Sequence, residues 1–345
     1  MEEAMREMLA AVALSVLAAG PAWAAKTPDY HLVKAMTIGA PDRWDYVVFD
    51  PAMQRAYVAH GDVVTVVDVA AGKVAGTLKV GGTTHGIAIV SALGKGYADD
   101  GQSGTVMVFD PKTLKLLRHI KAEPDADGIV YDPQGDHVLV ITGDSGKVVM
   151  IDPKTDKVTA EIDGGGPLEF GVLDGHGKFY VDGEEKNEVV RMDLGTAKAD
   201  AHWPLTGCKT PHGLAIDRAH MRLFASCGSG AMDVMDARNG KVLATLPIGA
   251  GTDGAAFDAR RGLAFSSNRD GTLSIIAETA PGKFAALSPV STQRGARTLA
   301  LDTASGRIFL VASDVTENKT MARDARGRFK VVPGSARLLI LQPDR

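Results

Sequence analysis

Seven polar residues recur along the chain at nearly equal intervals, and their side chains are of types that do chemistry in proteins. Successive members are 40, 42, 42, 43, 41 and 44 residues apart, and the set consists of Asp45, His85, Asp127, Glu169, His212, Asp253 and Arg297. Imidazole nitrogens together with carboxylate oxygens can ligate a divalent cation such as Zn, Cu, Ni or Mn, transfer protons, or bind a charged ligand. If the fold brings these groups together, they will shift one another's pKa values unless a cation, an arginine or water compensates their charges.

Each of these residues opens one copy of a repeated unit. The unit has a strand of the type xG-apolar-x-apolar-Asp, a strand that ends in small or polar residues, a β-rich strand that ends in Asp, and a last strand that opens with Lys. A four-stranded unit of about 40–45 residues is the blade of a β-propeller. The sequence therefore predicts an all-β fold, a seven-bladed β-propeller with four-stranded blades that fills residues 25–345 as a single domain. The blades are numbered 1 to 7 and start near residues 45, 85, 127, 169, 212, 253 and 297.

The last blade finds its fourth strand at the other end of the sequence. After the third strand of blade 7, RLLILQ342, only a few residues follow. Residues Tyr30 to Gly39, YHLVKAMTIG, match the fourth-strand pattern before blade 1 begins. We therefore expect an N-terminal strand over residues 30–39 to close the last blade, which would remove the free sheet edges of an open array.

Several segments resemble the YVTN-repeat, YncE-like family of exported propellers. The resemblance covers essentially residues 30–345 and rests on AYVAHGDVVTVVD68, HVLVITGDSGKVVMID152 and RLFASCGSGAMDVMD236, on DPKTDKV and ARNGKV turns, and on VVPGSARLLIL near the C-terminus. No repeat contains the literal Tyr-Val-Thr-Asn, and blades 4 and 6 are degenerate. The resemblance implies an exported scaffold whose members mostly lack an established reaction.

The N-terminal residues have the pattern of a signal peptide. Met8 to Ala19 is an apolar stretch too short to span a bilayer, and Ala22-Trp23-Ala24 is a small-x-small cleavage site. We expect residues 1–24 to be removed, so that the mature chain begins at Ala25 and is periplasmic or secreted. The alternative is a cytosolic chain with a buried N-terminal helix. No later apolar run is long enough to span a membrane.

Cys208 and Cys227 are the two cysteines of the chain. Because export leads to an oxidising compartment, a disulfide between them is the favoured interpretation. Cys208 comes just before the first strand of blade 5 and Cys227 ends the second, so a bridge would hold the loop that leads to His212. Two free, buried thiols, or a Cys-x-x-x-His metal pair of Cys208 and His212, are the alternatives.

The seven recurring polar residues, called the ring residues below, are expected on one face of the propeller. The innermost strand of each blade lines the channel, and its N-terminal residue stands on the top face, which also carries the loops between second and third strands. His85 and His212 are candidate metal ligands in this ring, and His60, on a loop of the same face, is a further one. The structural alternative is that the ring residues cap strand ends and solvate a water-filled channel.

A long basic segment interrupts the last blade on the same face. It runs roughly over residues 315–335 and contains Lys319, Arg323, Arg326, Arg328 and Lys330. It is either a lid or docking surface for an acidic ligand, or a solvated loop.

Composition and motifs favour binding over catalysis. The net charge is -4 and no Lys/Arg-rich block occurs, which disfavours a nucleic-acid partner. No nucleophile-base pair stands out, so the first hypothesis is a non-catalytic, monomeric, exported propeller that holds a small molecule, a metal ion or a periplasmic protein. One alternative is a metal-dependent hydrolase, lactonase or lyase at the same ring, with a divalent metal as its cofactor. Another is an accessory protein of periplasmic quinone-cofactor oxidation.

Overall fold

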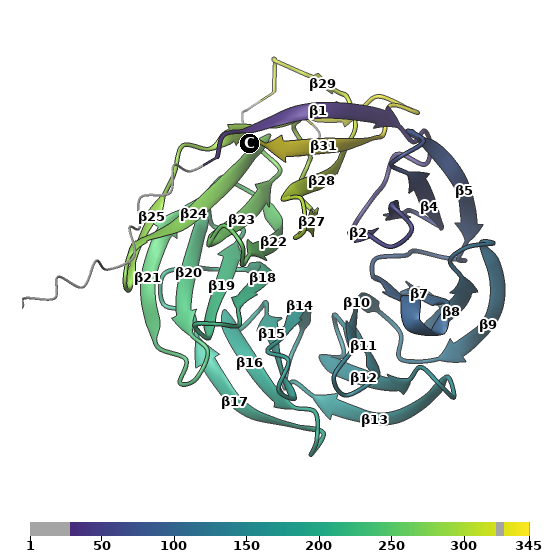
Figure 1. Ribbon diagram of the computed structural model, residues 1–345, viewed down its shortest axis with the longest axis horizontal. Coiled ribbons are helices and arrows are strands. Elements are labelled where there is room, and N and C mark those ends of the chain that lie inside the picture. The colour runs from purple at the N-terminus through teal and green to yellow at the C-terminus, as the bar shows by residue number, and fades with distance from the viewer. Residues whose placement is uncertain (1–27, 322–327, 345) are drawn as a thin grey trace, which may run out of the picture.

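Seven antiparallel sheets surround a central channel and form a β-propeller (Figure 1). The computed structural model describes residues 28–321 and 328–344. Within these ranges, regular structure other than strands is limited to a 3-10 helix, η1 (Ser91–Leu93). The predicted all-β, seven-bladed fold with four strands per blade is confirmed. The predicted signal peptide, residues 1–24, lies outside the described residues.

The strands of each blade run in order from the channel to the outer edge. Blades 1 and 2 consist of β2 (Val47–Asp50), β3 (Arg55–His60), β4 (Val63–Asp68) and β5 (Lys73–Lys79), and of β6 (Ile87–Val90), β7 (Lys95–Asp100), β8 (Thr105–Asp110) and β9 (Lys115–Lys121). Blades 3 and 4 consist of β10 (Ala126–Asp132), β11 (His137–Thr142), β12 (Lys147–Asp152) and β13 (Lys157–Asp163), and of β14 (Leu168–Leu173), β15 (Lys178–Gly183), β16 (Glu188–Asp193) and β17 (Lys198–Pro204). Blades 5 and 6 consist of β18 (Pro211–Asp217), β19 (Arg222–Cys227), β20 (Ala231–Asp236) and β21 (Val242–Pro247), and of β22 (Thr252–Asp258), β23 (Leu263–Asn268), β24 (Thr272–Ala280) and β25 (Lys283–Ala286), with β26 (Val290–Ser291) also paired to β24.

Blade 7 is closed by the N-terminal strand, as predicted. Its order is β1 (Tyr30–Thr37), β31 (Arg337–Pro343), β28 (Arg307–Ala312) and β27 (Leu299–Asp302). The antiparallel ladder between β1 and β31 runs from Tyr30 opposite Pro343 to Thr37 opposite Arg337. The strand ends at Thr37, two residues before the predicted end at Gly39.

The middle strands of the blades are apolar because neighbouring blades cover both of their faces. In β12, Val148 packs toward Phe179 of blade 4, while Val149 packs toward Tyr97 of blade 2. All four side chains are fully buried. This alternation follows from side chains that point to opposite faces of a strand. The aspartate that ends β12, Asp152, accepts a hydrogen bond from the backbone N–H of Lys154 at 2.8 Å and so shapes the following turn.

Glycines after several ring residues let the innermost strands approach one another closely. A Cβ added at Gly86 would lie 2.3 Å from the backbone nitrogen of Ile129, and one at Gly213 would lie 2.7 Å from the backbone carbon of Gly254. Contacts this short leave no room for a side chain. The glycines therefore set the radius of the channel at the level of the ring.

β-Bulges place ring residues outside the regular strand pairing. In blades 3, 5 and 6, the register of the first two strands shifts around Asp127, His212 and Asp253, each of which is left as the extra residue. In blade 4 the shift spans Glu169 and Phe170. Bulges bend a strand locally and re-aim its side chains, which accounts for ring residues that turn toward the channel.

The basic segment of blade 7 contains a small hairpin. Its strands are β29 (Val315–Glu317) and β30 (Phe329–Val331). Arg328 pairs with Glu317 at 2.5 Å, and so its charge is used within the hairpin. Lys319 and Lys330 are exposed, whereas Arg323 and Arg326 lie outside the described residues.

Candidate functional site

All seven ring residues line one cavity at the top of the channel. The cavity has a volume of about 340 Å³, and its other lining residues are Arg43, Gly228, Gly251, Thr252 and Arg269. The structure therefore brings together the complete set that the repeat spacing singled out.

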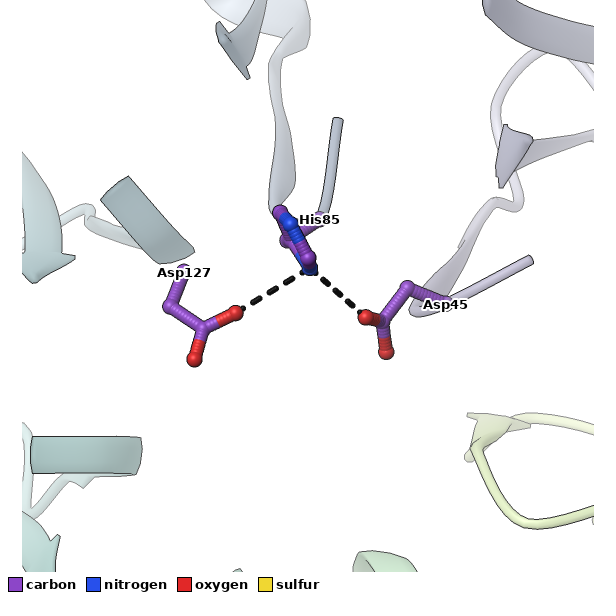
Figure 2. Close-up of side chains that lie close together, drawn as sticks. All are labelled: Asp45, His85 and Asp127. Atoms are coloured by element: carbon purple, nitrogen blue, oxygen red, sulfur yellow. Dashed lines mark hydrogen bonds and ion pairs between the residues drawn. The ribbon is translucent and has the colours of Figure 1, made fainter. Parts of the chain in front are cut away.

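In blades 1 to 3, an imidazole lies between two carboxylates (Figure 2). Nδ1 of His85 is 2.7 Å from Oδ2 of Asp45 and 3.1 Å from Oδ1 of Asp127. Burial alone would lower the pKa of His85, but the hydrogen bond and charge of Asp45, together with the charge of Asp127, raise it to about 9. Burial and the neighbouring charge of Glu169 raise the pKa of Asp127 above its ordinary value.

Asp99 holds the backbone of His85 in place. It lies on β7, is fully buried, and accepts hydrogen bonds at 2.7 Å from the backbone N–H groups of both His85 and Gly86. Burial raises the pKa of Asp99 to about 7, although these donors lower it in part. Sequence analysis did not identify Asp99, because its position near the end of a second strand gives no sign of which backbone groups it meets.

In blades 4 to 6, a second imidazole faces carboxylates at longer distances. Nδ1 of His212 is 3.5 Å from Glu169 and 3.8 Å from Asp253, and Nε2 is 3.7 Å from Glu184. These are ion-pair distances, and Nδ1 is buried without a hydrogen-bond partner. Burial lowers the pKa of His212, but Glu169, Asp253 and Glu184 outweigh it and raise the pKa to about 9.

Arg297 of blade 7 joins the two halves of the ring. Its guanidinium is 2.6 Å from Asp253 and 3.7 Å from Asp45, and it donates a hydrogen bond to the backbone carbonyl of Trp44 at 3.1 Å. Burial raises the pKa of Asp253 to about 6, although the charge of Arg297 lowers it in part.

Two aromatic residues meet across the channel next to the ring. Tyr46 and Phe170 follow Asp45 and Glu169 in the sequence, at positions where four other blades have glycine. Their ring centroids are 5.1 Å apart, and the hydroxyl of Tyr46 donates a hydrogen bond to Glu169 at 3.4 Å. Burial and the surrounding carboxylates, Glu169 first among them, raise the pKa of Tyr46 well above its ordinary value. Of the three breaks in the glycine pattern, the two that are aromatic were the available sequence signal for this contact.

Cys208 and Cys227 form a disulfide, as predicted. Both are buried, and Cys227 is the last residue of β19. Cys208 lies four residues before His212, so the bond fixes the segment that leads into β18. The free-thiol and Cys-His metal alternatives are therefore excluded for this form of the protein, since a disulfide sulfur carries no thiolate.

His60 does not join the other two histidines. It is the last residue of β3 rather than a loop residue, it is fully buried, and it is not among the residues that line the cavity. Its Nδ1 is hydrogen-bonded to the hydroxyl of Thr65 at 2.9 Å. β3 is the second strand of its blade and so lies one strand away from the channel. The side chain of His60 at its end is buried inside the blade, like that of Cys227 at the end of β19.

Two groups of three side chains have metal-ligating atoms close together. One group is Asp45, His85 and Asp127, and the other is Glu169, Glu184 and His212. Glu184, which follows β15, was not identified from the sequence, because it belongs to a turn rather than to the repeated ring position. In the first group Nδ1 of His85 lies within hydrogen-bond distance of both carboxylates, whereas the contacts of His212 in the second group are longer.

Behind the second group lies a buried carboxyl without partners. Asp182 on β15 is fully buried, and neither of its oxygens has a hydrogen-bond partner. Burial, and then the charge of Glu169, raise the pKa of Asp182 well above its ordinary value. Asp182 occupies the blade position that Asp99 has in blade 2.

Comparisons with known proteins identify the fold. No protein-family model and no curated protein matches the sequence. Among solved structures, hydrazine synthase of Kuenenia stuttgartiensis is similar, with a TM-score of 0.67 and 15% sequence identity over 80% of this chain and 93% of that chain. In the described residues, no helix has the length and apolar character needed to cross a bilayer. At this level of identity, the likeness establishes the β-propeller architecture alone.

Proposed function

We propose that this protein is an exported, non-catalytic binding propeller of the YVTN-repeat, YncE-like kind, which holds a small polar ligand at the top of its channel. The observation that carries the proposal is the convergence of all seven ring residues on one cavity. Side chains that only capped strand ends would each serve their own blade. Here His85, His212 and Arg297 each contact carboxylates of two neighbouring blades.

The protonation of the two histidines supports binding over acid-base catalysis. With pKa values raised to about 9, His85 and His212 are imidazolium ions near neutral pH and act as hydrogen-bond donors rather than bases. Of the described residues that line the cavity, Thr252 is the one that carries a hydroxyl, and this hydroxyl is hydrogen-bonded to Ser266 at 2.7 Å. It has no base beside it to activate it for attack.

Export rests on the predicted signal peptide and is supported by the disulfide, because disulfides persist in oxidising compartments. Fractionation of the native host followed by N-terminal mass analysis tests this part. We expect the periplasmic or secreted fraction to contain a chain that begins at Ala25. A full-length chain in the cytosol would contradict it.

A thermal-shift screen tests the binding site. Purified mature protein is heated with a panel of inorganic anions, amines, amino acids and divalent metal salts, and a ligand at 100 times its Kd should stabilise the fold by about 2.7 kcal/mol. The double variant Glu169→Gln with His212→Asn should lose the shift. A matched control is Glu161→Gln, since Glu161 is exposed on β13 and pairs only with Lys147 across its own blade. A shift that survives the ring substitutions, or no shift with any probe, would contradict the proposed site.

A second candidate is a metal-dependent hydrolase, lactonase or lyase at the same ring. The observation that favours it is the group of Glu169, Glu184 and His212, whose donor atoms lie close together and leave Nδ1 of His212 without a hydrogen bond. Elemental analysis after exposure to Zn, Mn, Cu or Ca salts should find one metal per chain in the parent protein and less in Glu184→Gln. Absence of bound metal after each exposure would rule out this mechanism.

A further inference from the structure

The charges around the ring alternate except at one place. In ring order, His85 lies between Asp45 and Asp127, His212 lies between Glu169 and Asp253, and Arg297 lies between Asp253 and Asp45. Each of the three cationic groups contacts both of its neighbours. The distances are 2.7 and 3.1 Å for His85, 3.5 and 3.8 Å for His212, and 2.6 and 3.7 Å for Arg297. A ring of seven members cannot alternate completely. The step from Asp127 in blade 3 to Glu169 in blade 4 therefore brings two carboxylates side by side with no cationic ring residue between them.

Two buried polar groups beside this step in the ring also lack partners, although the first of them, Asp182, does not itself line the cavity. Asp182 is fully buried opposite the bulge that carries Glu169, and both of its oxygens are without hydrogen bonds. In blade 2 the equivalent Asp99 is satisfied by two backbone N–H groups. Nδ1 of His212, from the next blade, is also buried and unpartnered. Asp127 and Glu169 each contact one cationic ring residue, whereas Asp45 and Asp253 each contact two. The side of the cavity formed by blades 3 and 4, called the acidic wall below, is thus the part of the ring whose carboxylates have the fewest cationic partners.

The opposite side of the cavity carries unpaired positive charge. Arg43, which precedes blade 1, and Arg269, from the turn between β23 and β24 of blade 6, line the cavity together with Arg297. Within the described parts of the chain, the guanidinium groups of Arg43 and Arg269 form no ion pair. Blade 7, with β27 and β28, lies across the channel from β10 and β14 of blades 3 and 4 (Figure 1). Arg43 and Arg269 flank blade 7 and form a basic wall that faces the acidic wall.

This inference rests on the proposed binding function and names its ligand class. We propose that the cavity binds a small zwitterion, with its ammonium group at Asp127 and Glu169 and its carboxylate at Arg43 and Arg269. Opposite walls of opposite charge match a molecule that carries both charges at its two ends, whereas a simple amine or a simple acid satisfies one wall only. Arginine suits the carboxylate end, because its guanidinium binds a carboxylate through two parallel hydrogen bonds.

The size of the cavity selects among zwitterions. A sphere with the volume of the cavity is about 9 Å across, which is on the scale of a small ligand. In an α-amino acid the two charges are too close together to reach both walls. An aliphatic ω-amino acid separates them by several carbons, and so it can contact both.

Isothermal titration calorimetry of the purified mature chain tests the proposal with probes of graded charge. The probes are γ-aminobutyrate and ε-aminohexanoate as zwitterions, butylamine as the amine alone, butyrate as the acid alone, and glycine as the short zwitterion. We expect at least one of the two ω-amino acids to bind about tenfold or more tightly than butylamine, butyrate and glycine, as loss of a charge-assisted hydrogen bond predicts. Equal affinity for butylamine or butyrate would overturn the proposal.

Variants of each wall assign the two ends of the ligand. Arg269→Gln should lower the affinity for the ω-amino acid to that for butylamine. The affinity for butylamine itself should not change. Glu169→Gln should lower the affinity for both the ω-amino acid and butylamine. Arg269 is exposed and makes no ion pair among the described residues, so its substitution keeps the fold even where Glu169→Gln does not. Arg238→Gln is the matched control, since Arg238 is 58% exposed in a turn away from the cavity, and it should bind as the parent does. Unchanged affinity in Arg269→Gln would overturn the assignment of the basic wall.

The outcomes separate this inference from the proposed function. If no ω-amino acid binds but another probe of the thermal-shift panel binds in a way that depends on Glu169 and His212, the zwitterion proposal is wrong and the binding site stands. If no probe of either experiment depends on the ring, both are wrong.

Discussion

Arg297→Met should destabilise the propeller in a pH-dependent way, because Arg297 is the ion-pair partner of a buried carboxylate. The guanidinium lies 2.6 Å from Asp253, whose side chain is 10% exposed. Among the described residues, no backbone N–H donates to the carboxylate of Asp253, and His212 is 3.8 Å away. Removal of Arg297 therefore leaves the charge of Asp253 without a close partner.

The size and sign of the effect follow from the burial of this pair. Breaking a buried ion pair costs about 3–5 kcal/mol, and because the side chain of Arg297 is 26% exposed we expect the lower end, about 3 kcal/mol. Burial already raises the pKa of Asp253 to about 6. Without Arg297 this pKa moves higher, and each further unit lowers the free energy of unfolding by about 1.4 kcal/mol once the carboxyl is ionised. A carboxyl whose pKa is raised by folding weakens the fold as pH rises, so the loss should be large near pH 8 and small near pH 5.

Denaturant unfolding followed by circular dichroism at both pH values measures the difference. The matched control is Arg261→Met, because Arg261 is 27% exposed and pairs at 2.7 Å with Asp258, which ends the same strand as Asp253. Asp258 keeps hydrogen bonds from the backbone N–H groups of Arg260 and Arg261 at 2.9 and 3.2 Å after that substitution. The control should therefore lose less stability and show no increase of the loss with pH. Equal losses for Arg297→Met at pH 5 and pH 8, or an equal loss in the control, would refute the reasoning.

Three further predictions concern the scaffold. Replacing both Cys208 and Cys227 by serine should lower the free energy of unfolding by about 3 kcal/mol, since the disulfide closes a loop with a sequence separation of 19; unchanged denaturant unfolding, or two free thiols in non-reducing peptide mapping, would oppose this. Deleting residues 25–37 should expose the edge of β31 and cause loss of monomer in size-exclusion chromatography, whereas an unchanged profile would speak against closure by β1. Gly86→Ala should prevent blades 2 and 3 from packing, because the new Cβ would lie 2.3 Å from the backbone nitrogen of Ile129. The control is Gly195→Ala in a turn, and equal melting temperatures for the two variants would contradict this prediction.

Much of the fold could be read from the sequence because a propeller repeats one short-range pattern. The observed third strands β4, β8, β12, β16 and β20 each end in an aspartate, as the repeated unit predicts. The closing strand was predicted for the same reason, because Tyr30 to Thr37 carries a fourth-strand pattern that has no blade of its own. Periodicity also found the ring, since residues at equivalent blade positions share one face.

The contacts between blades could not be predicted in this way. Tyr46 and Phe170 meet across the channel from blades 1 and 4, and nothing local in either segment indicates which of the other six blades it faces. Glu184 reaches His212 from the turn of a neighbouring blade, and so it lies outside the repeated position. His60 was predicted to lie on a loop as a further candidate ligand, but it is the last residue of β3 and its side chain is fully buried. Repeat spacing gives the position of a residue within its blade, whereas the identity of its neighbours depends on how the ring closes.

The pairing of β1 with β31 also affects how the protein folds and unfolds. It joins Tyr30 to Pro343, so among the ladders of residues 28–321 and 328–344 it has the greatest sequence separation, and it contributes a high contact order. Such pairing forms late, because the entropy of closing so long a segment must be overcome first. Once formed, it holds β1 as the outermost strand of the last blade, whereas β31 is paired on its other side with β28. Resistance to proteolysis should therefore depend on how fast β1 separates from β31, because that step opens the last blade.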